Sequence, residues 1–205
     1  MLPDYWSEAM ADLGAADPVM AGLIAAYPGA SLRSRGDAFS TLARSIVGQQ
    51  ISVKAADSVW ARFLARVGEL APTRLLALGC SGLDDCGLSQ RKREYLLDLA
   101  AHFDSARLDP AHWPRLDDAA IIAELTAVRG IGRWTAEMFL IFNLMRPDVY
   151  PLDDIGLQRA VGRHYLACAK ATRAELIELG QRWRPWRSVA TWYLWRSLDP
   201  LPVEY

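Results

Sequence analysis

The sequence VRGIGRWTA at residues 128–136 lies between two segments that have the hydrophobic pattern of helices. Upstream, residues 118–128 carry apolar side chains at three- and four-residue spacing, and downstream, residues 134–145 are apolar on nearly every side. The few residues between these segments suit a tight turn. Gly130 and Gly132 leave backbone amides uncovered before the second helix, where the helix dipole favours an anion such as a DNA phosphate. The glycines alone would equally suit an ordinary turn between helices.

A second informative stretch is PLDD at residues 151–154. Ile155 begins another helical pattern, so Asp153 or Asp154 lies at a helix N-terminus. An aspartate at such a position usually caps the helix by accepting a backbone N–H. A cap needs only one carboxylate, and the motif supplies two.

Together these motifs resemble the helix-hairpin-helix DNA glycosylases that have a Gly/Pro-rich loop and a catalytic aspartate. Within that group they are most similar to the 3-methyladenine DNA glycosylase II branch. The resemblance extends over residues 38–198 and includes GQQIS at residues 48–52 and WRPWRS at residues 183–188. It implies an all-α fold of two helical lobes with an active-site cleft between them, formed by a single domain over residues 1–205 with the hairpin at 118–146.

The resemblance also implies hydrolysis of the N-glycosidic bond of an alkylated, 3-methyladenine-type base flipped out of duplex DNA, a step of base excision repair. Asp154 matches the catalytic aspartate, whose negative charge would stabilise an oxocarbenium-like transition state, and Asp153 would then cap the helix or organise the loop. Trp134 and Trp195 match pocket aromatics, which attract a cationic purine by their electron-rich faces. The family's further pocket tyrosine is Met138 in this chain, which leaves the range of bases open.

The DNA-contacting residues implied by the resemblance lie in two loops. Gln50 is the first candidate for the side chain that wedges into the DNA stack, and Gln49 is the candidate for holding the opposing strand. Both would otherwise be surface glutamines. The hairpin contributes the remaining expected DNA contacts, which are Arg129, Gly130, Gly132, Arg133 and Thr135.

The resemblance further bears on cofactors and on the mechanism. The backbone carbonyls of Val128 and Ile131 are expected to be able to hold a monovalent cation that bridges to phosphate. In the bifunctional relatives a lysine that forms a Schiff base occupies the hairpin position of Trp134. Tryptophan cannot form that adduct, so we expect simple hydrolysis without strand cleavage.

The bulk properties of the chain set limits on its partners and cofactors. The 205 residues carry a net charge of −1, so any attraction to DNA has to be local. Cys80, Cys86 and Cys168 form no C-x₂-C pair, which argues against a zinc site or an iron–sulfur cluster. An odd number of cysteines without a signal peptide or a long apolar span favours the cytoplasm. We expect a monomer that does not associate with a membrane and requires no cofactor.

The rest of the sequence predicts helices and no strands. Residues 1–36 form one or two short helices without a chemical motif, and the expected N-caps of later helices are Asp37, Ser52, Ser89 and Thr172. Arg91, Lys92 and Arg93 fall in the first turn after Ser89, where the helix dipole disfavours cations. They either serve a second purpose, such as phosphate contact, or form a solvated face.

Two other functions compete with an alkylated-base glycosylase. A non-catalytic helix-hairpin-helix module would need Gly130 and Gly132 but not the carboxylate of Asp154. A glycosylase for oxidised or mismatched bases is disfavoured by Trp134, by Trp195 and by the missing cysteine cluster.

Overall fold

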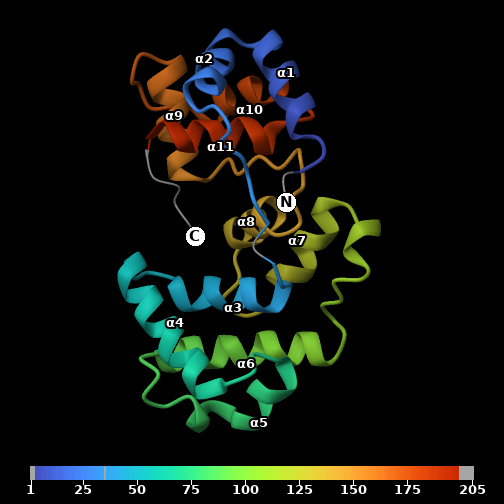
Figure 1. The fold of residues 1–205 in the computed structure, drawn as a ribbon, viewed down its shortest axis with the longest axis vertical. Coiled ribbons are helices and arrows are strands. Elements are labelled where there is room, and N and C mark those ends of the chain that lie inside the picture. The colour runs from blue at the N-terminus through green and yellow to red at the C-terminus, as the bar shows by residue number, and fades with distance from the viewer. Residues whose placement is uncertain (1–2, 35, 199–205) are drawn as a thin grey trace. The chain divides into compact units, whose positions relative to one another are not determined.

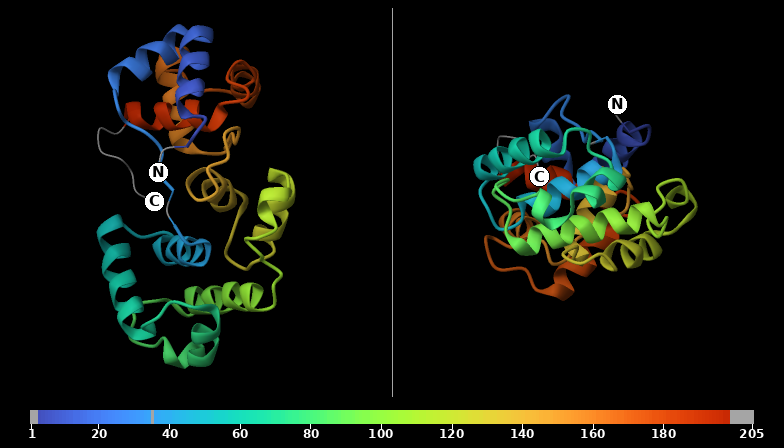
Figure 2. Two further views of the ribbon diagram at one scale, coloured as in Figure 1. Left: turned by 45° about the vertical axis from the view of Figure 1, so that its right-hand side comes forward. Right: turned by 90° about the horizontal axis from the view of Figure 1, so that it is seen from below.

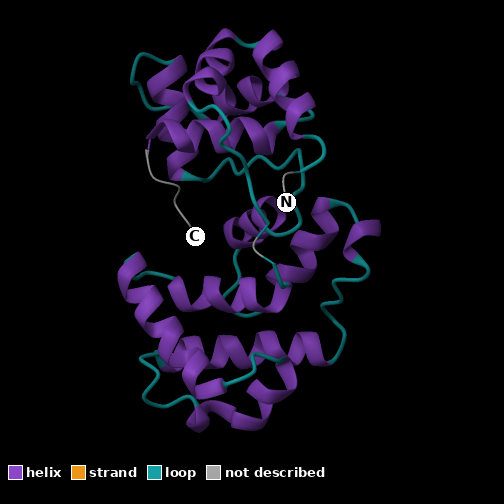
Figure 3. Cartoon of the chain, viewed as in Figure 1, coloured by secondary structure: helices purple, strands orange, loops and turns teal. Residues whose placement is uncertain are grey.

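The computed structural model describes residues 3–34 and 36–198. Within these ranges the regular elements are eleven α-helices and one short 3₁₀ helix, with no strand (Figure 3). The predicted all-α class is therefore confirmed. None of the helices in the described part of the chain is long and apolar enough to cross a lipid bilayer.

The chain divides into two compact units, and the boundary falls inside one helix, α8 (Arg133–Phe142). Unit 1 contains residues up to Ser34 together with residues from Leu140 onward. Unit 2 contains residues 35–139. Unit 1 is thus built from two segments that lie far apart in the sequence, whereas unit 2 is one continuous stretch.

Unit 2 is organised around a long helix, α6 (Gln90–Asp104), which packs against α5 and α3 (Figures 1 and 2). The other helices of this unit are α3 (Ala38–Gly48), α4 (Val53–Val67), α5 (Pro72–Gly82), η1 (Trp113–Arg115), α7 (Asp118–Thr126) and the first part of α8. The predicted caps are confirmed, because the side chains of Asp37, Ser52 and Ser89 each accept a backbone N–H from the third following residue.

Unit 1 is organised around α11 (Arg187–Leu198), which packs against helices from both ends of the chain (Figure 1). These are α1 (Trp6–Ala16), α2 (Pro18–Ala26) and α9 (Ile155–Tyr165), and α10 (Arg173–Arg182) completes the unit. Of the one or two short helices expected in residues 1–36, the structure has two, and Thr172 caps α10 through a capping box with Glu175.

Asp17 connects three parts of unit 1 through one buried carboxylate, which is 4% exposed. Its Oδ1 accepts the backbone N–H of Val19 at 2.9 Å and of Met20 at 3.2 Å, and so caps α2. Its Oδ2 accepts the hydroxyl of Tyr165 at 2.8 Å and the indole N–H of Trp183 at 3.0 Å. The N-terminal helices are thereby tied to the end of α9 and to the residue that follows α10.

The second hairpin helix, α8, differs from its prediction in two respects. The apolar pattern predicts a helix to Met145, but α8 ends at Phe142, and the N–H of Arg146 turns back to the carbonyl of Leu140 at 2.9 Å. Met145 has a φ of +55°, which an α-helix does not allow. The helix is also not buried on every side, because Trp134 in its first turn is 38% exposed.

Candidate active site

Asp154 is both buried and placed at the first turn of α9 in unit 1. The side chain is 7% exposed, and its Oδ1 accepts the backbone N–H of Leu157 at 2.6 Å, the geometry of an N-cap. The expectation that Asp153 caps this helix is therefore wrong. The N–H of Asp154 bonds the carbonyl of Pro151 at 2.9 Å, and this turn brings Asp154 to the cap position. Asp153 is exposed and pairs with Arg173 at 2.7 Å.

Trp195 contacts the same carboxylate oxygen from α11. Its indole Nε1–H donates to Asp154 Oδ1 at 2.7 Å, while its ring stacks on Phe142 with ring centroids 5.8 Å apart and an interplanar angle of 14°. Two donors thus converge on one oxygen of Asp154, and the stacked Phe142 ring fixes the plane of the indole. The arrangement holds a carboxylate in one orientation, as a group that stabilises developing positive charge requires.

Gly156 lies directly beneath this contact. A Cβ atom at position 156 would come within 3.0 Å of Trp195 Cδ1 and 3.1 Å of Asp154 Oδ1. Real Cβ atoms rarely approach other atoms so closely, so a larger residue would push the indole and the carboxylate apart. The close approach of Trp195 to Asp154 therefore depends on a glycine at this position.

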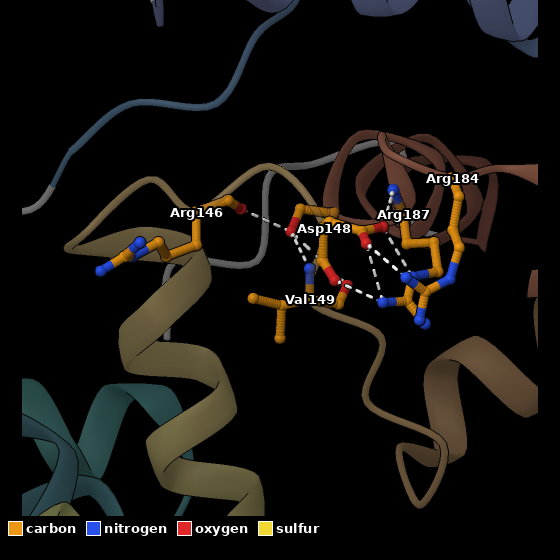
Figure 4. A network of polar contacts seen from close by, with 6 residues as sticks. Arg146, Asp148, Val149, Arg184 and Arg187 are labelled. Atoms are coloured by element: carbon orange, nitrogen blue, oxygen red, sulfur yellow. Dashed lines mark hydrogen bonds and ion pairs between the residues drawn. The ribbon is translucent and has the colours of Figure 1, made fainter. Parts of the chain in front are cut away.

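The loop that leads to Asp154 is fastened to the start of α11 by an ion pair (Figure 4). Arg187 Nε donates to Asp148 Oδ1 at 2.6 Å, and Nη2 donates to Oδ2 at 2.9 Å, which is the bidentate geometry of a strong pair. Arg184 lies beside them, with Nη1 3.4 Å from Asp148 Oδ2. The WRPWRS motif thus gains a local role, which is to anchor the loop before PLDD.

Ser188 adds a second attachment to the same loop. Its Oγ donates to the carbonyl of Arg146 at 2.6 Å and accepts the N–H of Val149 at 2.9 Å, while its own N–H bonds the carbonyl of Pro147 at 3.0 Å. Ser188 is fully buried. Residues 146–149 are consequently held at several backbone positions shortly before the candidate catalytic aspartate.

The hairpin turn lies in unit 2 and rests on α6. Gly130 has a φ of +86°, and a Cβ at this position would overlap the ring of Tyr95, so both backbone and space require glycine. Asp98 Oδ2 accepts the N–H of Arg129 at 2.9 Å. Gly132 differs, because a Cβ there would meet none of the described residues within 4 Å apart from its own neighbours along the chain. Its absent side chain leaves the backbone at the start of α8 open to a ligand.

The other hairpin residues divide into exposed and buried positions. Arg129 and Arg133 are exposed, and Arg133 Nε donates to Glu137 Oε1 at 2.9 Å. Thr135 and Met138 are buried. Of the two candidate pocket residues on α8, only Trp134 therefore has a substantially exposed side chain.

The two glutamines of the GQQIS loop differ in conformation and in contacts. Gln49 Nε2 donates to the carbonyl of Gly130 at 2.8 Å, which links this loop to the hairpin. Gln50 is exposed and has a φ of +60°, the left-handed region that non-glycine residues rarely adopt. An exposed side chain on a left-handed backbone is consistent with the predicted wedge. The side-chain amide of Gln49, in contrast, is hydrogen-bonded within the protein.

The cations at the start of α6 have internal partners in two of three cases. Lys92 Nζ donates to the carbonyls of Val47 and Gln49, each at 2.8 Å. Arg93 pairs with Asp84, and Arg91 is exposed. The expected second purpose of Lys92 and Arg93 is thus a contact with this chain, and the solvated-face interpretation applies to Arg91.

Side chains suited to a tightly bound metal do not gather in the described residues, where no group of three or more His, Cys, Asp or Glu side chains is placed to hold an ion. At the hairpin, the carbonyl of Val128 accepts the N–H of Ile131 at 3.1 Å, as in a β-turn. A carbonyl oxygen has a second lone pair, so this bond still allows Val128 to contact a cation.

Residues 43–185 match the family model described as HhH-GPD superfamily base excision DNA repair protein. The chain belongs to this superfamily.

Several members of the HhH-GPD superfamily are similar over most of the chain. A solved structure of DNA-3-methyladenine glycosidase from Bacillus halodurans is 34% identical, with a TM-score of 0.87, and the match covers 96% of this chain and 92% of that one. The Schizosaccharomyces pombe 3-methyladenine DNA glycosylase, solved in complex with abasic DNA, has a TM-score of 0.79 at 28% identity, covering 95% and 98%. Escherichia coli DNA-3-methyladenine glycosylase 2 is 32% identical over 195 residues, covering 88% and 64%.

The chain spans only part of the length of some relatives. The chain is 32% identical over 169 residues to a protein of Bacillus subtilis, and the match covers 78% of this chain and 59% of that protein.

Sequence reasoning missed two members of the Asp154 cluster, Gly156 and Phe142. Glycine in the first turn of a helix lowers helix stability, and this unfavourable choice at Gly156 is a signal that the sequence carries. Phe142 carries no such signal, because it is one apolar residue among many in the hairpin helix of this HhH-GPD chain.

Proposed function

We propose that this protein is a monofunctional DNA glycosylase that hydrolyses the N-glycosidic bond of 3-methyladenine-type bases in duplex DNA. The observation that carries the proposal is the carboxylate of Asp154, buried at the start of α9 and fixed by donors from Leu157 and Trp195. Relatives in the HhH-GPD superfamily that are named DNA-3-methyladenine glycosylases support the choice of base.

In the proposed reaction the bond between C1′ of the deoxyribose and the base nitrogen breaks, and its electron pair leaves with the base. The sugar develops positive charge, which the carboxylate of Asp154 stabilises electrostatically. Water then attacks C1′ and releases a proton to solvent, so that the products are the free base and an abasic site. A preorganised charge of this kind contributes on the order of 3 kcal/mol or more to lowering the barrier.

DNA binding is proposed to use the two loops of unit 2. The open backbone at Gly132 and the exposed guanidinium groups of Arg129 and Arg133 suit phosphate contacts. Gln50 would fill the gap that the extruded nucleotide leaves, and extrusion costs a few kcal/mol. Trp134 and Trp195 are proposed to face the base, whose positive ring charge their indole faces attract.

The absence of strand cleavage is proposed from Trp134 and from the contacts of Lys92. A Schiff-base mechanism needs an amine that can attack the sugar. The position of the hairpin nucleophile of bifunctional relatives is Trp134, and the amine of Lys92 already donates to two backbone carbonyls. A DNA strand cut at the abasic site by the pure protein without alkali would contradict this part of the proposal.

The decisive experiment compares wild type with Asp154→Asn on DNA methylated with dimethyl sulfate. The amide oxygen of asparagine can still cap α9, so the variant should fold and bind DNA. We expect wild type to release 3-methyladenine and 7-methylguanine, and Asp154→Asn to release them at least about 100-fold more slowly. Equal release by both proteins would refute the role of Asp154, and binding without release by wild type would indicate a non-catalytic module.

The same assay with oligonucleotides that carry hypoxanthine, ethenoadenine or 8-oxoguanine tests the substrate class. Release of an oxidised base in preference to the methylated purines would exclude the alkylated-base proposal. Met138, which replaces a family tyrosine, is the residue whose exchange to tyrosine should change the order of preference.

The remaining parts of the proposal concern the setting of the reaction. We propose that the protein acts as a monomer in the cytoplasm and requires no cofactor, and that the carbonyls of Val128 and Ile131 can hold a monovalent cation. DNA affinity that stays the same when potassium is replaced by tetramethylammonium at constant ionic strength would contradict the cation site.

A further inference from the structure

Lys92 occupies an unusual position between two helix ends. It lies in the first turn of α6, where the dipole of its own helix disfavours a cation. Its amine, however, reaches the C-terminal end of α3, where it donates to the carbonyls of Val47 and Gln49 at 2.8 Å each. These carbonyls lie where a helix has no further N–H groups of its own to offer.

Partial burial of the Lys92 amine has a cost. Removal of the amine from water lowers the pKa of Lys92, which means that burial disfavours its charged form. The two hydrogen bonds of this half-buried lysine offset that cost, and what matters for the site is the backbone that they hold in place.

The backbone that Lys92 holds is the loop of the candidate wedge. Gln49, whose carbonyl accepts one of the two bonds, directly precedes Gln50, the residue with a φ of +60°. A left-handed conformation costs a non-glycine residue about 1–2 kcal/mol, so it persists only where the neighbouring backbone is fixed. The bond to Gln49 fixes that backbone on the side that precedes Gln50.

The same face of α6 also holds the hairpin. Lys92, Tyr95 and Asp98 follow each other at three-residue spacing and therefore share one side of the helix. Tyr95 lies against Gly130, and Asp98 accepts the N–H of Arg129. The side chain of Gln49 links its loop to the same hairpin by donating to the carbonyl of Gly130.

We propose that Lys92 is a positioning residue for base extrusion, which holds the Gln49–Gln50 loop in register with the hairpin on a common platform formed by α6. The inference rests on the proposed function, because it assumes that Gln50 enters the DNA stack. Lys92 itself need not contact DNA. Its loss should impair the extrusion of a paired base more than the breakage of the glycosidic bond.

The test compares two duplexes that carry one 7-methylguanine, either paired with cytosine or opposite an abasic-site analogue. The second duplex has lost the base pair, so extrusion is easier and the wedge matters less. For Lys92→Met, we expect single-turnover base release from the paired duplex to fall about tenfold, the effect of losing a hydrogen bond to a charged group. Release from the duplex with the abasic analogue should fall by less than about threefold.

Arg91→Met is the matched control for loss of a positive charge in the same turn of α6, since Arg91 is exposed. Its effect on DNA affinity should be shared by both duplexes. The ratio of base release from the paired duplex to release from the duplex with the abasic analogue should therefore stay unchanged. Lys92→Arg keeps donors for both carbonyls and should restore most of the ratio. An unchanged ratio in folded Lys92→Met would overturn the inference while leaving the glycosylase proposal intact, whereas an inactive wild type would overturn the glycosylase proposal.

A second variant covers the case in which Lys92→Met does not fold. Gln49→Leu leaves Lys92 in place and removes the bond to the carbonyl of Gly130. It should lower the same ratio of rates by a similar factor. Equal slowing on both duplexes would indicate a general structural defect and would count against the platform.

Discussion

Gly156 sets the distance between the two side chains on which the proposed chemistry depends. Trp195 reaches Asp154 Oδ1 at 2.7 Å because position 156 offers no Cβ that would lie within 3.2 Å of the indole nitrogen. The size of the residue at position 156 thus bears on the contact between the indole and the carboxylate. Helix propensity alone would disfavour glycine at this position, since glycine weakens a helix.

At this scale we expect Gly156→Ala to reduce activity without reducing stability. The added methyl group should displace the indole by a few tenths of an ångström and weaken a hydrogen bond worth about 1.5 kcal/mol, which corresponds to roughly tenfold in rate. The gain in helix propensity, up to about 1 kcal/mol, should offset the steric strain. Single-turnover base release and thermal melting measure the two effects.

Gly22→Ala in α2 is the control for this substitution, because a Cβ at Gly22 would meet nothing within 4 Å. It should raise the melting temperature and leave base release unchanged. Full activity in Gly156→Ala would show that the contact between Trp195 and Asp154 is not needed.

At the scale of the element, the hairpin turn contains two glycines that are present for different reasons. Gly130 is required by the fold of the turn, since its φ is positive and Tyr95 fills the space beside it. At Gly132 no side chain of the described residues fills the space that a Cβ would occupy. The difference separates the folding of the turn from its use in binding.

We therefore expect opposite effects from two alanine substitutions in this turn. Gly130→Ala should lower the free energy of unfolding by about 3 kcal/mol, from left-handed strain together with overpacking against Tyr95. Gly132→Ala should leave that free energy nearly unchanged but weaken binding to duplex DNA about tenfold, or 1.4 kcal/mol. Urea denaturation and fluorescence anisotropy measure these quantities. Unchanged DNA affinity in Gly132→Ala would argue against a phosphate at this turn.

The helices also show which features of the fold can be predicted from the sequence. Helices with a polar N-cap and a regular apolar face, such as those after Asp37, Ser52 and Ser89, could be predicted because both signals are local. The contact of Lys92 with Val47 spans 45 residues, and no local pattern indicates it. The capping role of Asp154 was misassigned because two adjacent aspartates look alike until the backbone turn at Pro151 is known.

At the scale of the whole molecule, half-buried tyrosines with raised pKa values occur in unit 1. Burial raises the pKa of Tyr5 to about 12, and it also raises the pKa of Tyr150 and Tyr165, the last aided by the bond to Asp17. Each of these phenols is favoured in its neutral form by the fold. Their contribution to stability is complete below the unfolded pKa near 10 and is lost as pH rises toward the folded values.

We expect unit 1 to lose stability at alkaline pH before unit 2. In protein labelled with 5-fluorotryptophan, the ¹⁹F signals of Trp6 and Trp183 should move to unfolded positions at lower pH than those of Trp60 and Trp113 as pH rises from 9 to 12. Tyr165→Phe should flatten the pH dependence of the melting temperature. Earlier loss of the Trp60 and Trp113 signals would contradict the assignment of alkaline sensitivity to unit 1.

The division of the chain into one continuous and one split unit has a consequence for biosynthesis. Residues 36–139 form unit 2 as one continuous stretch, so this unit can fold on the ribosome once they have emerged. The first two helices are made earlier but must wait, because Trp183 and α11, which they contact, are translated more than 150 residues later. Nascent chains stalled before α11 should therefore expose α1 and α2 to protease while the later-made middle segment is already protected.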